Sequence, residues 1–443
     1  MNKNYDLAVG AKRLEKVTPS LIRTILDRAS VLRSEGKPVI PFSAGEPDFN
    51  TPSDIKEAAI RAITNNQSKY TSNRGYPALR KVLHDYIKRE TTVDYDPETE
   101  ILVTSSAAEA LNNAIMTFVD EGDDVIVFTP SFVSYKCLVN MCGGNFVDIP
   151  LDGAKGYQLD IEAVKKAITD KTKMVIINNP CNPTGAVFDY DSLKELCELA
   201  VEHNFLILSD EIYSRLVYDG ATFYSIASFP GMKDHSIIIS GFSKTFAMTG
   251  WRIGYLSTAK KFADKILRTH QYSTTCSPTF IQVALSEAMD TKRTRKEVVE
   301  MHDAFAKRRQ MFMDGLDEIP GLSYSKPYGA FYIMVDVSGL GMTSSEFSQK
   351  LLEEKYVATV PAIGLGETTG KYVRISYATS DENIKEGLRR IKEMVSELKK
   401  YCCPQDLFFA GSCKTMTIHG KTAMDGSPVS HIYIWRDIHG EKD

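Results

Sequence analysis

Three polar segments that could do chemistry each follow an apolar run of strand length. The string NNPCNPTG at 178–185 follows the run 174–177, Asp210 follows the run 206–208, and Lys244 follows the run 236–239. Arg252 stands eight positions after this lysine. In open α/β sheets ligands bind at the carboxyl ends of the strands, so these groups are predicted to face one site. The amide of Asn182 can donate there to a phenolate or carboxylate oxygen.

Each of these residues also has an interpretation without a function. The proline-rich string could be only a structural turn, and a single lysine such as Lys244 is more often a solvated surface residue. A carboxylate at a strand end is either paired or functional, because burying an unpaired charge is costly. The three segments occur in this order along the chain, and the NPxNPTG string is far more specific than a lone glycine-rich loop. Together they favour the functional interpretation.

The elements that must position these residues are predicted to form an α/β fold. Short apolar runs at 125–128, 174–177, 206–208 and 236–239 alternate with helix-like stretches such as 107–118 and 192–203. This alternation indicates βαβ units and a mostly parallel sheet. Continuous apolar runs are typical of parallel strands that are buried on both faces.

A second, smaller α+β region is predicted from about residue 281. It would contain a long helix at 281–316, a strand at 329–334, a helix at 345–354, a strand at 372–376 and a charged helix at 381–400. The expected domains are therefore a large domain at 46–285 and a small domain at 286–400. An N-terminal segment at 1–45 is expected to pack with the small domain.

The last segment, 401–443, has a composition of its own and is interpreted as an atypical extension. It holds three of the eight cysteines and three of the eight histidines, with a strand-like run at 431–435. The spacing of Cys402, Cys403, Cys413 and His419 matches no common ligand pattern. A short hairpin or a poorly ordered extension is expected there, and no metal.

Composition excludes several classes of protein. The 443 residues carry a formal net charge of -4, which gives no electrostatic footprint for nucleic acid or an anionic membrane. No apolar run is long enough to span a bilayer, and the polar N-terminus lacks a signal-peptide core, so a cytoplasmic location is expected. The cysteines form no CxxC pair and the histidines no HExxH motif, which favours reduced thiols and no catalytic metal.

Taken together, the motifs strongly resemble the class I aminotransferases, which are fold type I pyridoxal-phosphate enzymes. The resemblance covers roughly residues 10 to 400 and includes SAGEPDF at 43–49, GYPALR at 75–80 and YVRISYA at 372–378. The string FSKTFAMTGWR at 242–252 looks much like that of the aromatic enzymes in the prokaryotic aspartate/aromatic subgroup. The resemblance implies a seven-stranded, mostly parallel sheet in the large domain and pyridoxal 5'-phosphate as cofactor.

The resemblance also implies roles for the residues of the reaction centre. Lys244 would bond covalently to the cofactor aldehyde and then act as general base. Asp210 would keep the pyridine nitrogen protonated, so that the ring accepts electrons from the carbanion. Tyr213 and Asn182 would bond the phenolic oxygen of the cofactor. Phe132 matches the residue whose ring stacks on the cofactor, although an ordinary core phenylalanine is the alternative.

Phosphate and carboxylate groups are assigned partners in the same way. The cofactor phosphate would bind the start of a helix at Ala107 and Ala108, together with Ser243 and Arg252. Ser240 is a second candidate for the hydroxyl, and Tyr70 would reach the phosphate of the neighbouring subunit in a homodimer. Arg374 would clamp the substrate carboxylate close to the backbone of Gly45, beside Asn182.

The donor amino acid is predicted from positions where this sequence differs from the usual pattern of the family. Ala108 stands where bacterial aspartate enzymes often have a lysine, and the segment 272–278 offers hydroxyls and no arginine. An aromatic or broad-range donor is therefore expected, with 2-oxoglutarate as acceptor. The loop at 361–370 also departs from the family, since Ala362 replaces the usual glycine.

Three alternative functions stay open. An aspartate aminotransferase is one, although Ala108 weakens it, and a lyase or synthase of the same fold, which would use the same Lys244 and Asp210, is another. A non-catalytic transcription regulator would need an N-terminal DNA-binding module, for which the segment before Gly45 leaves no room.

Overall fold

The computed structural model describes residues 10–17 and 21–402, and the chain divides into two units, 1–397 and 398–443. The description below concerns the first unit. The strand-like run expected at 431–435, and with it the character of the extension, lies outside the described residues. Within the described residues, no helix is long and apolar enough to cross a membrane.

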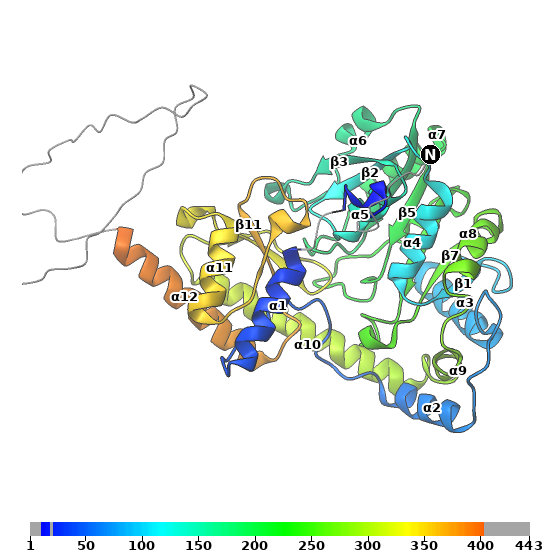
Figure 1. The fold of residues 1–443 in the computed structure, drawn as a ribbon, viewed down its shortest axis with the longest axis horizontal. Helices are drawn as coiled ribbons and strands as arrows, with labels where there is room; N and C mark the ends of the chain where they lie inside the picture. The colour runs from blue at the N-terminus through cyan, green and yellow to red at the C-terminus, as the bar shows by residue number, and fades with distance from the viewer. Residues whose placement is uncertain (1–9, 18–20, 403–443) are drawn as a thin grey trace, which may run out of the picture. The chain divides into compact units, whose positions relative to one another are not determined.

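The larger part of this unit is built around a seven-stranded sheet (Figure 1). Every neighbouring pair is parallel except those involving β7, which runs antiparallel to both of its neighbours. In spatial order the strands are β1 (Ile101–Thr104), β7 (Gly254–Thr258), β6 (Ser236–Gly241), β5 (Leu206–Asp210), β4 (Thr172–Asn178), β2 (Asp124–Thr129) and β3 (Asn145–Pro150). The predicted mostly parallel sheet is confirmed.

The central strands are buried on both faces, which explains their continuous apolar runs. Along β5, Leu206 and Leu208 pack into one hydrophobic cluster and Ile207 packs into another. Side chains alternate between the faces of a strand, so both faces need apolar residues when helices cover both. One face carries α4 (Ala107–Phe118), α5 (Ser134–Met141) and α8 (Lys260–Ser273).

The opposite face of the sheet is covered by a second set of helices. Their buried aliphatic residues, such as Leu83 and Leu196, belong to the same cluster as Ile207. These helices are α2 (Ser53–Thr64), α3 (Pro77–Thr91), α6 (Ile161–Ala167), α7 (Tyr190–Glu202) and α9 (Thr279–Ala288). The chain therefore builds a three-layer arrangement with the sheet in the middle.

A four-stranded antiparallel sheet forms the second hydrophobic centre of the unit. Its strands in order are β10 (Val360–Pro361), β11 (Tyr372–Ser376), β9 (Tyr332–Asp336) and β8 (Ser323–Tyr324). The surrounding helices are α10 (Lys292–Asp317), α11 (Ser344–Lys355) and α12 (Asp381–Cys402). Near the N-terminus, α1 (Leu21–Ser34) packs Ala29 and Leu32 against Leu352 of α11.

Two predicted elements differ from the structure. The helix expected at 281–316 is interrupted, because α9 ends at Ala288 and Thr291 caps α10 by accepting a hydrogen bond from the amide of Thr294. The strand expected at 329–334 begins only at Tyr332, because Ala330 has a φ of 56° and leaves extended geometry.

Candidate functional site

The carboxyl ends of β4, β5 and β6 lie side by side and bring the three polar segments together. Asn178 at the end of β4 pairs with Asp210 at the end of β5, and Asp210 pairs with Ile239 of β6. The NNPCNPTG string and the segment with Lys244 continue from the outer two of these strand ends. The strand-end prediction therefore holds for the backbone.

Lys244 is half-buried next to the segment that contains Gly45. Its Nζ donates a hydrogen bond to the carbonyl oxygen of Gly45 and lies 5.9 Å from the centre of the Tyr213 ring. Burial lowers the pKa of this lysine to about 8, because an ammonium group loses hydration there. Four charged groups also act on it, with opposite signs: Glu46, Arg374, Asp210 and Arg252. An amine with this pKa can serve as nucleophile and base near neutral pH.

Asp210 is 5% exposed and has two donors on its carboxylate. The hydroxyl of Tyr135 donates to Oδ2 at 2.7 Å, and the amide of Ile212 donates to Oδ1 at 3.2 Å. Burial raises its pKa to about 6, while these two hydrogen bonds act in the opposite direction. The strand-end rule identified Asp210 but not Tyr135. The available signal in the sequence was its position three residues after Phe132. In the structure the two rings pack edge to face, with their centres 5.6 Å apart.

Arg374 of β11 reaches the NNPCNPTG segment. Its Nη1 donates to Oδ1 of Asn182 at 3.1 Å, and its Nη2 donates to the carbonyl of Ser43 at 3.1 Å. The guanidinium also lies 4.5 Å from the centre of the Tyr332 ring. Arg374 is only 3% exposed, and no acceptor among the described residues meets its Nε. A buried donor without a partner is costly, which makes this nitrogen a place for an acceptor from a ligand.

Tyr213, beside Lys244, and Tyr332, beside Arg374, are in contact with each other. Their hydroxyl oxygens are 3.1 Å apart, and both side chains are buried. Burial raises the pKa of Tyr213 well above its usual range. A Cβ added to Gly45 would lie 3.4 Å from the Tyr332 hydroxyl, so the backbone at Gly45 passes close to the pair of tyrosines. Sequence reasoning placed Tyr332 in a strand and missed its position in the site.

The start of α4 lies against β7 near Arg252. Gly254 pairs with Thr104, and a Cβ on this glycine would lie 2.5 Å from the amide nitrogen of Ala107. The preceding Ser106 has a φ of 97° and makes no side-chain cap on the helix. The first amides of α4 therefore stay available for an anion, as they do at uncapped helix starts.

Arg252 and Ser243 are two further residues predicted to bind phosphate, and Arg252 lies two residues before Gly254, which packs against this helix start. Arg252 is exposed, and its Nη1 donates to the carbonyl of Thr249 at 2.9 Å. Ser243 is half-buried next to Lys244. Ser240 lies elsewhere: its hydroxyl donates to the carbonyl of Glu211 at 3.4 Å and lines a separate cavity of about 330 Å³.

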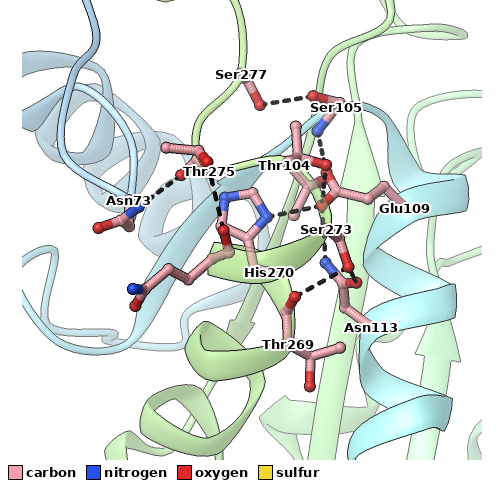
Figure 2. Close-up of polar contacts among 12 residues, drawn as sticks. Asn73, Thr104, Ser105, Glu109, Asn113, Thr269, His270, Ser273, Thr275 and Ser277 are labelled. Carbon is pink, nitrogen blue, oxygen red and sulfur yellow. Dashed lines mark hydrogen bonds and ion pairs between the residues drawn. The ribbon is translucent and has the colours of Figure 1, made fainter.

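Three of the hydroxyls expected from 272–278 have hydrogen-bond partners inside the chain (Figure 2). Thr274 donates to the Glu109 carboxylate at 2.9 Å, and Ser273 donates to the carbonyl of Thr269 at 2.9 Å. Ser277 accepts from the hydroxyl of Ser105 at 3.4 Å. These three hydroxyls have partners within the protein, whereas the Tyr272 side chain of the same segment is 88% exposed. Tyr70 is also exposed, at 87%.

Comparison with known proteins identifies the family. Residues 37–391 match the family model described as aminotransferase class I and II. The chain belongs to this family. It is 40% identical over 387 residues both to an aspartate aminotransferase of Pyrococcus abyssi and to aromatic-amino-acid aminotransferase 2 of Thermococcus litoralis. Each match covers 87% of this chain and 98% of the relative.

The solved structures lead to the same family. The chain resembles the aromatic aminotransferase of Pyrococcus horikoshii with a TM-score of 0.80 and 39% identity, over 85% of this chain and 99% of that one. The protein is thus a pyridoxal-phosphate-dependent aminotransferase with a fold type I architecture. The predictions of family, fold class, enzyme class and cofactor are confirmed.

The residues present fit this cofactor. A buried carboxylate at Asp210 suits a protonated ring nitrogen, and the amine of Lys244 has a pKa low enough to react. Because Gly254 has no side chain, its backbone can lie against the first amides of α4, where a phosphate can be held. The unpaired Nε of Arg374 suits the carboxylate of an amino acid.

Proposed function

We propose that Lys244 is the residue that holds the cofactor and moves the substrate proton. Bound pyridoxal phosphate supplies an aldehyde and a ring that accepts the electron pair left at the substrate Cα. The Lys244 amine would bond covalently to the cofactor in the resting enzyme. Once freed by the substrate, it would take the proton from Cα. Its lowered pKa supports this role, because a neutral amine is needed for both steps.

Asp210, Tyr213 and Asn182 are proposed to set the electronic state of the ring. Asp210 would pair with the ring nitrogen, and the hydrogen bond from Tyr135 would orient its carboxylate. Tyr213 and the amide nitrogen of Asn182 would donate to the phenolic oxygen. The Oδ1 of Asn182 already accepts from Arg374, which leaves the nitrogen of the same amide to donate.

The phosphate is proposed to bind at the start of α4, with Arg252 and Ser243 as further donors. Tyr70 would reach the phosphate of a neighbouring subunit in a homodimer. Support for the homodimer comes from two exposed tyrosines, Tyr70 and Tyr272, at 87% and 88% exposure. Their segments are joined by the hydroxyl of Thr279, which donates to the carbonyl of Lys69 at 2.6 Å.

Arg374 is proposed to clamp the α-carboxylate of the amino acid, beside the backbone of Gly45. The unpaired Nε of this buried guanidinium is the single observation that supports the binding site best. A carboxylate that accepts from Nε would remove the cost of a buried donor without a partner. The clamp would orient the Cα–H toward Lys244.

The amino donor is proposed to be an aromatic amino acid or a broad range that includes one, with 2-oxoglutarate as acceptor. Ala108 supports this proposal, because it offers no cation to a side-chain carboxylate. A buried cation would penalise phenylalanine, since desolvating it without a partner is costly. Aspartate is the second candidate donor, because the chain is similar to the aspartate aminotransferase of Pyrococcus abyssi.

The donor is tested by a panel of amino acids with 2-oxoglutarate as acceptor. We expect phenylalanine or tyrosine to react with a kcat/KM comparable to that of aspartate or higher. A preference for aspartate above about a thousandfold, which is about 4 kcal/mol in the transition state, would overturn the aromatic or broad-range donor. It would leave the aminotransferase activity itself in place.

A cytoplasmic location is also proposed. The five cysteines whose side chains are described, at positions 137, 142, 181, 197 and 276, are all free thiols. Free thiols are typical of a reducing compartment.

A further inference from the structure

A buried polar cluster lies behind the start of α4, on the side of α8 (Figure 2). Glu109, the third residue of α4, accepts four hydrogen bonds. Its Oε1 accepts from Nδ1 of His270 at 2.7 Å, from Asn113 at 2.8 Å and from Thr274 at 2.9 Å. Its Oε2 accepts from the backbone amide of Ser105 at 2.5 Å. We call these five residues the Glu109 cluster.

Glu109 is a carboxylate inside this cluster. Burial alone would raise its pKa, but the hydrogen bond from His270, with those from Ser105 and Asn113, holds the pKa below its ordinary value. Every partner donates and none accepts, which is the arrangement that suits an ionised group. The carboxylate therefore brings a negative charge close to the first turn of a helix.

His270 is fully buried, and its Nε2 meets no partner among the described residues. The tautomer with its proton on Nδ1 donates to Glu109 and leaves no buried N–H unpaired. The hydrogen bond from Nδ1 holds the Glu109 carboxylate in place.

The cluster ties two segments of the chain to the same carboxylate. Ser105 and Ser106 form the turn before α4, and this turn carries the unusual φ of 97° at Ser106. Thr274 lies in the segment after α8, which also contacts Asn73 through the carbonyl of Thr275 at 2.8 Å. A shift of Glu109 would therefore move the backbone just before Ala107.

We propose that Glu109, held by His270, is a positioning residue for the cofactor phosphate. By fixing the amide of Ser105, the carboxylate sets the turn whose following amides, at Ala107 and Ala108, face the anion. The inference rests on the proposed phosphate site at the start of α4. Glu109 itself does not touch the phosphate and acts through the backbone of the turn.

Charge and position predict opposite results when Glu109 is changed, which makes the proposal testable. Replacement by glutamine removes a negative charge close to a dianion, and this alone would strengthen phosphate binding. Glutamine also has only one oxygen, so it cannot accept from both Ser105 and the His270 side of the cluster. The positioning role predicts weaker binding in spite of the favourable charge change.

The experiment measures binding of inorganic phosphate and of pyridoxal phosphate to the apoenzyme. Phosphate binding is read from the increase in melting temperature with phosphate concentration, and cofactor binding from absorbance titration. For Glu109→Gln we expect both affinities to fall about tenfold or more, the size expected for hydrogen bonds to a charged group. Unchanged or stronger binding of phosphate would overturn the proposal.

Matched variants separate positioning from a general loss of packing. Thr117→Val removes a 2.8 Å hydrogen bond to Thr269 that joins the same two helices away from the turn. It should leave phosphate affinity unchanged, and an equal loss in this variant would also overturn the proposal. His270→Asn, which keeps a donor near the place of Nδ1, should retain more affinity than His270→Leu. This pair serves if Glu109→Gln does not fold.

Arg252→Ala distinguishes failure of the inference from failure of the proposed phosphate site. If Arg252→Ala weakens phosphate binding and Glu109→Gln does not, the site stands and the positioning role is wrong. If Arg252→Ala has no effect on phosphate binding, the proposed site is wrong, and the positioning role falls with it.

Discussion

Two neighbouring carboxylates at the end of β5 face different surroundings. Asp210 meets Tyr135 and lies within electrostatic reach of Lys244. Glu211, the next residue, accepts from the hydroxyls of Ser209 and Ser225 at 3.0 and 2.9 Å, and from the amide of Ile226 at 3.2 Å. Burial raises both pKa values, to about 6 for Asp210 and to about 8 for Glu211.

The difference lies in the neighbours, because both carboxylates are buried. Burial and the neighbouring Asp210 raise the pKa of Glu211, and its three hydrogen-bond donors lower it only in part, so Glu211 is expected to be protonated near neutral pH and to act as a hydrogen-bonding unit of the fold. Asp210 has a lysine nearby, and an added cation would lower its pKa further. The comparison therefore predicts a functional role for Asp210, on the side of Lys244, and a structural role for Glu211.

The comparison is tested most strongly at Lys244, the cation on the Asp210 side. Lys244→Ala should remove the borohydride-reducible bond to pyridoxal phosphate and lower turnover by at least about 10²–10⁴-fold, the usual contribution of a general base. Lys244→Arg should fail as well, because a guanidinium stays protonated. Mass spectrometry after borohydride treatment gives the readout. A Lys244→Ala protein that still bonds the cofactor covalently would refute the assignment.

The second test compares the two carboxylates directly. Asp210→Asn should fold and bind the cofactor but lose about 10²–10³-fold in kcat, the scale typical of removing a group that stabilises developing charge. Asp210→Glu should keep part of the activity. Glu211→Gln should keep most of it, since glutamine can still meet hydroxyl partners. Steady-state kinetics with one amino donor and 2-oxoglutarate give the comparison, and equal losses in Asp210→Asn and Glu211→Gln would contradict it.

The sequence predicted the parts of the fold that follow from local pattern. The four apolar runs at 125–128, 174–177, 206–208 and 236–239 all became buried strands, because parallel strands covered on both faces must be apolar throughout. The pattern did not reveal β3, an edge strand with several exposed residues, or β7, whose sequence GYLST mixes polar and apolar residues. The break between α9 and α10 depends on a cap at Thr291, which one long helical pattern concealed.

Prediction of the site followed the same division. Lys244, Asp210 and Asn182 stand at strand ends, and topology alone brings them together. Tyr135 and Tyr332 enter through contacts across 75 and 119 residues, which local pattern cannot anticipate. The sequence offered hydroxyls at 273–277 to a ligand, but it could not show that Ser273 has a partner in α8, Thr274 in α4 and Ser277 in the turn before α4. The roles of the site residues stay predictions.

The smallest expected effect is on the pH dependence of stability. The pKa of Glu211 is raised from about 4.5 to about 8 on folding, so between these values the folded protein binds more protons than the unfolded one. The free energy of unfolding therefore falls as pH rises through this window, by at most about 1.4 kcal/mol per pH unit. Glu211→Gln removes this proton uptake, and its melting temperature relative to wild type should rise from pH 5 to pH 8. For Asp210→Asn the corresponding rise should end near pH 6, because the pKa of Asp210 is raised only to about 6. Melting curves of the three apoenzymes at several pH values measure both differences. A Glu211→Gln difference that does not change with pH would mean that Glu211 is ionised in the folded protein, and the contrast between the two carboxylates would then be lost.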